Sequence, residues 1–188
     1  MQENRGKLIA AARKFFAEEG FSNTSMDSLT HSVGLTRGAL YHNFGDKKGL
    51  LAAVVTEIDN ELAAYAQNQS HVVGGGWEGL ITQEVSYIEQ ALRPEVRRIV
   101  LLDGPAFLGD PSQWPSQNAC MEVTKNAIIE LIEQKVLVPL DPESMARLLS
   151  GAAFNTALWV ASSDNPEHTL AKAIESYRQI AKGFLLNP

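Results

Sequence analysis

The chain has 188 residues, of which 45% are hydrophobic and 20% are charged. This composition predicts a globular protein with a sizeable core and excludes an intrinsically disordered chain. No apolar run is long enough to cross a bilayer, and no apolar signal core follows the first basic residues, so we expect a cytoplasmic protein without membrane contact. The single cysteine, Cys120, excludes an internal disulfide and a thiolate metal site, and we expect it to be a small hydrophobe on a helix.

The net charge of -6 is divided unevenly along the chain. Residues 1–50 carry seven Lys/Arg and five Asp/Glu, a net of +2, whereas the remaining residues carry nine and seventeen, a net of -8. The basic part suits contact with nucleic acid. The acidic remainder keeps non-specific adhesion to phosphates low.

Apolar residues recur at helical spacing in the first part of the chain. The pattern predicts a first helix from about residue 2 to 19, a second over 25–32 and a third over 37–43. Gly34 ends the second helix and Thr36 supplies the N-cap oxygen of the third. Two short helices joined by such a turn form a helix-turn-helix unit, whose second helix enters the major groove of DNA.

The rest of the chain also has helical spacing, and period two appears nowhere. The expected helices cover 47 to about 67, 77–92, 95–102 with one more turn at 106–108, 117–134, 142–162 and 167–186, and a glycine-rich linker covers 70–76. We therefore predict an all-α protein of about nine helices without a sheet. It divides into a three-helix domain over residues 1–46 and a helical body over residues 47–188.

Residues 15–51 resemble the DNA-binding domain of the TetR family of transcriptional regulators. The matching segments are Phe15-Phe16, Gly20-Phe21, Thr24-Ser25-Met26, Val33 through Gly38, Leu40 through Phe44, and Lys47 through Leu51. The resemblance implies a homodimeric, ligand-responsive regulator, a repressor of a double-stranded DNA operator, that is not an enzyme and needs no cofactor. Thr30 departs from the family, which has Ala there, and we expect its hydroxyl to bond back to the carbonyl of Met26.

The third predicted helix carries most candidate DNA contacts. Thr36 is an N-cap that, in the family, also donates to a phosphate. Arg37 is the candidate for reading guanine, with a phosphate contact as a nearly equal alternative. Gly38 permits close approach of the backbone to DNA, or is merely a tolerated weak helix former. Tyr41 and His42 match family positions that contact the phosphate backbone or a thymine methyl.

Two lysines follow this helix. Lys47 lies at the start of the fourth helix, where its charge opposes the helix dipole, and this placement makes sense if a phosphate sits there. Lys48 shares that role or is simply solvated. We expect Leu40 and Phe44 to belong to the core.

Seven residues of the body are candidates to line a ligand pocket, although ordinary core is the better reading for each one alone. They are Trp77, Tyr87, Asp103, Phe107, Trp114, Phe154 and Trp159. Trp114, in a proline-flanked loop, is expected near a pocket mouth. Asp103 either orients a polar or cationic ligand or bonds the backbone of residues 104–107 as a turn former, and we favour the turn. No set of residues has the spacing of a metal site or of a catalytic group, so none is predicted.

The resemblance also implies a mechanism. A small effector enters the body, tilts the fourth helix and changes the separation of two recognition helices that must match half-sites about 34 Å apart. The two final helices are expected to pair with their copies in a partner chain. One alternative is a helical small-molecule-binding protein or enzyme that uses the body pocket, which the lack of an acid–base constellation disfavours. Another is a DNA-binding adaptor gated by a protein partner.

Overall fold

The computed structural model describes residues 2–187, and these form an all-α protein, as the sequence predicts. The α-helices of this part are α1 (Gln2–Glu19), α2 (Met26–Ser32), α3 (Arg37–Phe44), α4 (Lys47–Val72), α5 (Gly76–Glu89), α6 (Gly104–Leu108), α7 (Pro115–Glu133), α8 (Pro142–Ser162) and α9 (Pro166–Ala181). Short 3-10 turns (Gln90–Leu92, Pro111–Gln113 and Lys182–Phe184) and the π-helix η2 (Val96–Asp103) complete the described elements. Within the described residues, no helix is long and apolar enough to cross a membrane.

The chain forms two compact units. Unit 1 contains the residues up to Asp59 together with Arg93–Pro111. Unit 2 contains Asn60–Leu92 and the residues from Ser112 onward. Helix α4 therefore contributes its first half to unit 1 and its second half to unit 2.

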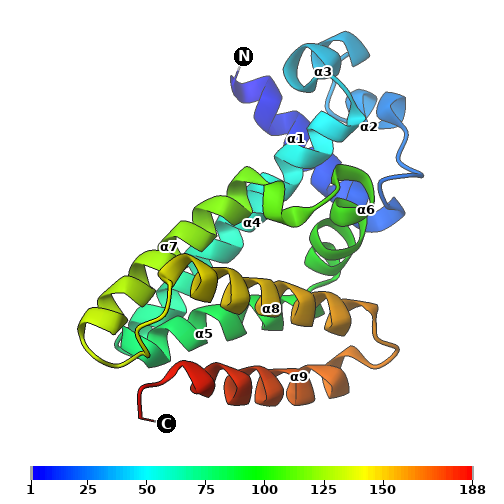
Figure 1. Cartoon of the computed structure of the whole chain (residues 1–188). Coiled ribbons are helices and arrows are strands. Elements are labelled where there is room, and N and C mark those ends of the chain that lie inside the picture. The colour runs from blue at the N-terminus through cyan, green and yellow to red at the C-terminus, as the bar shows by residue number, and fades with distance from the viewer. Residues whose placement is uncertain (1, 188) are drawn as a thin grey trace. The chain divides into compact units, whose positions relative to one another are not determined.

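In unit 1, helices α1, α2 and α3 pack against one another as a three-helix cluster (Figure 1). Their apolar faces supply fully buried side chains, namely Leu8, Ala12 and Phe16 of α1, Leu29 of α2 and Leu40 of α3, and Leu50 and Leu51 at the start of α4 are fully buried as well. Burying a leucine or phenylalanine side chain contributes roughly 1.5–3 kcal/mol, which compensates for the low intrinsic stability of helices as short as α2 and α3.

Local hydrogen bonds fix the ends of α2 and α3. Ser25 caps α2 by accepting from the amide of Ser28, and Thr36 caps α3 by accepting from the amide of Ala39. Gly34, in the turn between them, has a φ of 67°, a conformation that favours glycine. The hydroxyl of Thr30 donates to the carbonyl of Met26 at 2.9 Å, as predicted. These bonds set the angle at which α3 leaves the turn.

The segment Arg93–Pro111 of unit 1 differs from the predicted helix over 95–102. It forms the π-helix η2, which packs against α1, and then the short helix α6. Arg13 of α1 makes two hydrogen bonds of 2.7 and 2.8 Å to the carboxylate of Glu95 just before η2. This bidentate pair holds the pKa of Glu95 below its usual value. The π geometry depends on such tertiary contacts, which a helical periodicity does not reveal.

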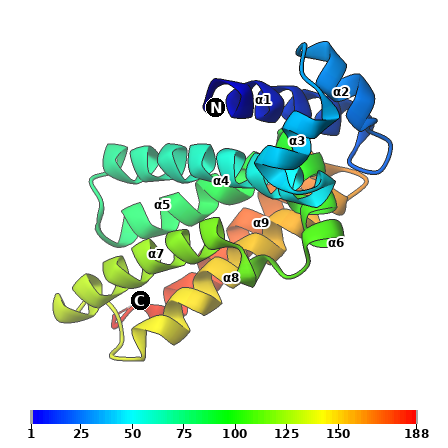
Figure 2. The same ribbon diagram turned by 90° about the horizontal axis from the view of Figure 1, so that it is seen from above.

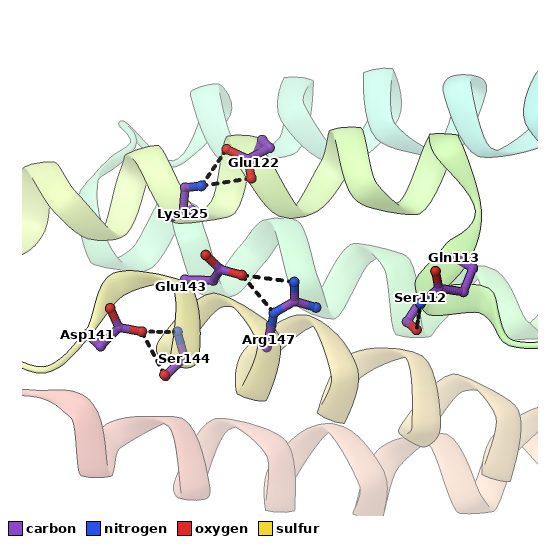
Figure 3. A network of polar contacts seen from close by, with 8 residues as sticks. All are labelled: Ser112, Gln113, Glu122, Lys125, Asp141, Glu143, Ser144 and Arg147. Carbon is purple, nitrogen blue, oxygen red and sulfur yellow. Dashed lines mark hydrogen bonds and ion pairs between the residues drawn. The ribbon is translucent and has the colours of Figure 1, made fainter.

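In unit 2, helix α8 packs against α5, α7 and α9 (Figures 1 and 2). Small residues on its inner face allow close contact, and Ala146, Ala153, Ala157 and Ala161 are buried there. Separate local polar contacts lie on both α7 and α8 (Figure 3): Lys125 pairs with Glu122 on α7, and Arg147 pairs with Glu143 on α8. Asp141 caps α8, and the hydrogen bonds that it accepts from the hydroxyl and the amide of Ser144 lower the pKa of Asp141.

Two predicted boundaries in unit 2 are wrong. Helix α4 continues to Val72 and α5 begins at Gly76, so the break expected over residues 70–76 covers only residues 73–75, of which Gly74 and Gly75 have positive φ. The final helix ends at Ala181 instead of residue 186. An isolated antiparallel bridge between Leu137 and Leu185 holds the following residues, because pairing with the α7–α8 connection replaces the last helical turn.

Candidate nucleic-acid interface

Helix α3 presents one face to solvent. Thr36, Arg37, Gly38, Tyr41 and His42 are all exposed. Arg37, Gly38, Tyr41 and His42 recur at i, i+1, i+4 and i+5 spacing, so they lie on one side of the helix, and Thr36 precedes them as the N-cap. On the opposite side Leu40 is fully buried against the core of unit 1. The core contact therefore fixes which face of α3 is available for a partner.

Arg37 is held by two neighbours on this surface. Its guanidinium donates to the hydroxyl of Tyr41 at 3.0 Å and pairs with the carboxylate of Asp27 at 3.3 Å. It also lies 5.6 Å from the centroid of the Tyr41 ring. The hydrogen bond to Tyr41, with the charge of Asp27, raises the pKa of Arg37. Asp27 was not a predicted site residue, and its place in the first turn of α2 was the signal that sequence reasoning missed.

The structure separates the two lysines that follow α3. The ammonium of Lys47 donates to the backbone carbonyl of Thr24 at 2.8 Å and to that of Ser22 at 3.4 Å. It also lies 4.7 Å from the centroid of the Phe21 ring. Partial burial lowers the pKa of Lys47. Lys47 thus ties the α1–α2 loop to the start of α4, whereas Lys48 is exposed and suits a phosphate contact.

Of the two residues predicted as core around α3, Leu40 is buried and Phe44 is only half-buried. The guanidinium of Arg5 lies 5.3 Å from the centroid of the Phe44 ring. Arg5 belongs to α1 and is itself exposed, so a basic side chain lies beside the end of α3.

The structure brings together three of the seven candidate pocket residues. In unit 2, the rings of Tyr87 and Phe154 are stacked with centroids 6.3 Å apart, and Trp114 meets Phe154 edge-on at 6.4 Å. Trp77 is half-buried. Trp159 has 52% of its surface exposed on α8, so it faces away from this aromatic cluster.

Asp103 and Phe107 belong to unit 1 and do not join the cluster. The carboxylate of Asp103 accepts from the backbone amide of Phe21 at 2.8 Å and from Arg98 at 3.3 Å. It does not make the expected turn within residues 104–107, because the corner after α1 supplies a donor from a distant part of the sequence. The ring of Phe107 lies against that of Phe21, with centroids 4.4 Å apart and planes tilted by 41°.

Glu84 is a polar core residue that sequence reasoning missed. It lies on α5 with only 6% of its surface exposed, and its carboxylate accepts from Thr124 and Ser150. Burial raises its pKa to about 7. Its position four residues before the buried Ile88 was a sequence signal for an inward-facing carboxyl group. Among the described residues, no group of three or more His, Cys, Asp or Glu side chains is arranged to hold a metal ion.

Comparison with known proteins supports the geometry of both units. Residues 8–54 match the model of bacterial regulatory proteins of the tetR family, and residues 77–184 match the tetracyclin repressor-like C-terminal domain. A TetR-family transcriptional regulator from Pectobacterium atrosepticum has 43% sequence identity and a TM-score of 0.89, and the match covers 100% of this chain and 97% of that one.

Curated relatives give the same result. The TetC protein of transposon Tn10 from Escherichia coli is 25% identical over 181 residues, which cover 96% of this chain and 89% of TetC. The transcriptional repressor AcnR from Corynebacterium glutamicum is 37% identical over 104 residues, or 55% of this chain and 54% of AcnR. These matches cover the cluster that carries α3 and the helical body together. The chain therefore belongs to the TetR family and is a DNA-binding transcriptional regulator of the helix-turn-helix type.

Proposed function

We propose that this regulator is a homodimeric repressor that binds an operator through α3 and releases it when a small ligand binds the body. The exposed face of α3, fixed by the burial of Leu40, carries the proposal. Residues 1–46 read DNA, and residues 47–188 bind the effector and dimerise. A regulator with this role works in the cytoplasm, where its DNA is, and no catalytic step is part of it.

Each residue of the α3 face has a role in this proposal. Arg37, steadied by Tyr41 and Asp27, reads a base edge. Thr36 and the amides of the first turn of α3 meet a phosphate, and Gly38 lets the backbone approach closely. The phosphate backbone is contacted by Tyr41, His42 and Lys48. Lys47 makes the same kind of contact once its ammonium group exchanges its present carbonyl partners for a phosphate. Phosphate contacts supply affinity, whereas Arg37 supplies sequence preference.

The final helices support a homodimer. Leu148 and Trp159 of α8 and Ile180 of α9 expose 62%, 52% and 73% of their surfaces, although each is a large apolar side chain. Helices α8 and α9 pack together, so both apolar faces belong to one helix pair. A second copy that covers them forms a four-helix interface and removes these side chains from water. Trp159 thereby acts in dimerisation rather than in a pocket.

The relatives support the sign of regulation. AcnR and a protein from Mycobacterium tuberculosis that matches 65 residues of this chain are both named transcriptional repressors. A ligand releases DNA only if it binds the DNA-free state more tightly than the DNA-bound state. Since two α3 helices must match two half-sites, a small change in their separation weakens both contacts at once.

Replacement of Ile180 by glutamate tests the dimer and its link to DNA binding. A charge on a buried interface costs several kcal/mol, so Ile180→Glu is expected to be monomeric by light scattering and to lose at least about tenfold in affinity for DNA. Val72→Glu is the matched control, because Val72 is equally exposed at 73% but lies at the end of α4. A dimeric Ile180→Glu protein, or a monomer with unchanged DNA affinity, contradicts the proposal.

A further inference from the structure

Three helices of unit 2 bring a cluster of polar side chains together in the interior. Glu84 of α5 accepts hydrogen bonds from Thr124 of α7 at 3.1 Å and from Ser150 of α8 at 3.2 Å. Both bonds reach the same carboxylate oxygen, Oε1. No Lys, Arg or His of the described chain forms an ion pair with Glu84. An ionised carboxylate buried without a cation is costly, so Glu84 favours either its neutral form or a cationic partner.

Aromatic rings lie one helical turn from these polar groups. Tyr87 follows Glu84 by three residues on α5, and Phe154 follows Ser150 by four residues on α8, so each ring shares a helix face with a member of the polar cluster. Tyr87 and Phe154 stack, and Trp114 at the start of α7 meets Phe154 edge-on. The carboxylate and the three rings thus come from the same three helices.

A buried polar atom without a hydrogen-bond partner lies beside these rings. Trp114 is 7% exposed, and its indole Nε1 is buried without a hydrogen-bond acceptor anywhere in residues 2–187. A buried donor without an acceptor costs about 1–3 kcal/mol, and such groups are rare in folded proteins. A ligand that supplies an acceptor satisfies Nε1, and a donor on the same ligand would meet Oε2 of Glu84, because both protein hydrogen bonds go to Oε1.

We propose that Glu84 and the rings of Tyr87, Trp114 and Phe154 bind a small aromatic amine in its cationic form, whose ammonium group meets Glu84 and whose acceptor oxygen meets Trp114. The inference rests on the proposed function in one respect, namely that this amine is the effector. A cation compensates the buried carboxylate, and it is attracted to aromatic ring faces. A carboxylic acid ligand would place a second acid beside Glu84, which disfavours that class.

The charge state of Glu84 controls this recognition. Of the groups on the helices packed against α5, Thr124 and Ser150 are neutral, and Tyr177 of α9 is the titratable one that interacts with Glu84. Burial, with a smaller effect of Glu84, raises the pKa of Tyr177, so Tyr177 stays neutral. Since the pKa of Glu84 is about 7, the ionised form grows about tenfold between pH 6 and pH 8. Affinity for a cation therefore rises with pH over this range.

Calorimetric titration of the full-length protein with matched probes tests the inference. The probes are 3-phenoxypropylamine, the neutral 3-phenoxypropanol and the anionic 3-phenoxypropanoate, which share a ring and an ether oxygen. The amine is expected to bind at least about tenfold more tightly than the other two at pH 8, a difference of about 1.4 kcal/mol. 4-Phenylbutylamine, which lacks the ether oxygen, is expected to bind more weakly than 3-phenoxypropylamine.

Two variants test whether the preference for the amine over the alcohol and the acid depends on the Glu84 side chain. Glu84→Gln keeps the shape but not the charge, and it is expected to reduce the preference for the amine to within about twofold and to abolish its pH dependence. Glu89→Gln, on the exposed side of the same helix, is the control and is expected to behave as the wild type. An unchanged amine preference in Glu84→Gln overturns the inference, as does a wild-type protein that binds none of the probes or prefers the alcohol or the acid.

DNA titrations of the same samples separate this inference from the proposed function. If the amine binds at Glu84 but DNA affinity is unchanged, the binding site stands and ligand-controlled release fails. If the protein binds DNA but not the amine, the recognition site fails while the DNA-binding role stands. Amine binding that lowers DNA affinity in the wild type, but not in Glu84→Gln, supports both.

Discussion

Lys47 and Lys48 are neighbours in the sequence but differ in what their charges contact. The ammonium of Lys47 is bound by two loop carbonyls and lies beside the ring of Phe21. Lys48 is exposed and has the freedom to meet a phosphate. Sequence position alone does not distinguish them, because the difference depends on where the α1–α2 loop folds.

Alanine substitutions are expected to separate the two roles. Lys47→Ala removes the partner of two carbonyls and is expected to lower the free energy of unfolding by about 1–3 kcal/mol. Lys48→Ala is expected to leave that free energy unchanged and to reduce the slope of log affinity against log salt by about 1 on a random-sequence duplex. Urea titrations and fluorescence anisotropy measure the two effects. A stable Lys47→Ala protein, or an unchanged salt slope for Lys48→Ala, contradicts this assignment.

Glu84 makes stability depend on pH. Its folded-state pKa is raised from 4.5 to about 7, so the folded protein keeps a proton that the unfolded chain loses between these values. The stability from the neutral carboxyl is complete below pH 4.5 and is lost as pH rises past 7. Glu84→Gln does not ionise. It is expected to match the wild type near pH 5 and to be more stable at pH 8, by about 3 kcal/mol as an upper estimate.

Urea unfolding of both proteins at equal concentration and at both pH values measures this difference. A variant that is less stable than the wild type at pH 8 shows that the carboxylate is compensated in the folded state, which removes the premise of a raised pKa. Glu89→Gln serves as the control here too, because Glu89 is exposed and is expected to change stability equally little at either pH.

Among the elements of unit 1, η2 and α6 contact the corner between α1 and α2, which is formed by residues 20 and 21. The carboxylate of Asp103 ends η2 and accepts the amide of Phe21, and Arg98 joins the same oxygen. Gly20, at the corner, has a φ of 80°, and any added Cβ there meets the guanidinium of Arg98. A π-helix is an uncommon element that occurs often at functional sites. These contacts make the position of the corner depend on the geometry of η2.

Removal of the Asp103 carboxylate tests the strength of this connection. Asp103→Ala leaves the partly buried amide of Phe21 without its acceptor and is expected to cost about 1–3 kcal/mol of unfolding free energy. Asp103→Asn keeps one acceptor oxygen and is expected to cost less. Thermal unfolding with calorimetry measures both values. Equal stability of all three proteins shows that water replaces the carboxylate, and that the corner does not depend on η2.

Local signals predicted most of the fold. The N-cap at Thr36, the glycine turn at Gly34 and the helical period of α8 each depend on residues close in sequence, and the structure has them where expected. The π geometry of η2 and the bridge at Leu185 depend on partners far along the chain, so no local pattern reveals them.

The candidate site residues also differ in whether a local sequence pattern predicts their position. The exposed face of α3 follows from helical spacing around Leu40, and the structure presents that face to solvent. The pocket candidates were chosen for chemical type alone. Chemical type does not tell that Trp159 is exposed, that Asp103 bonds Phe21, or that Glu84 is buried among Thr124 and Ser150.

For the whole molecule, net charge and two-fold symmetry determine how tightly and at which sequences the protein is expected to bind DNA. The chain has a net charge of -6, so its affinity for DNA of any sequence is expected to be modest and to depend on the basic residues around α3. A single α3 helix reads only a few base pairs. Two copies held by the α8 and α9 faces read an inverted repeat, whose half-sites lie about one helical turn, roughly 34 Å, apart.

The claim that α3 reads the DNA sequence has a direct test, which is to select bound sequences from a pool of random DNA duplexes. The wild type is expected to enrich an inverted repeat, and Arg37→Ala is expected to enrich a repeat that has lost preference at one symmetric pair of positions, at a cost of about 1–3 kcal/mol per half-site. Tyr41→Ala is expected to bind the wild-type repeat more weakly without changing its sequence. A wild-type protein that enriches no repeat, or an Arg37→Ala protein that selects the same bases with the same strength, contradicts the account.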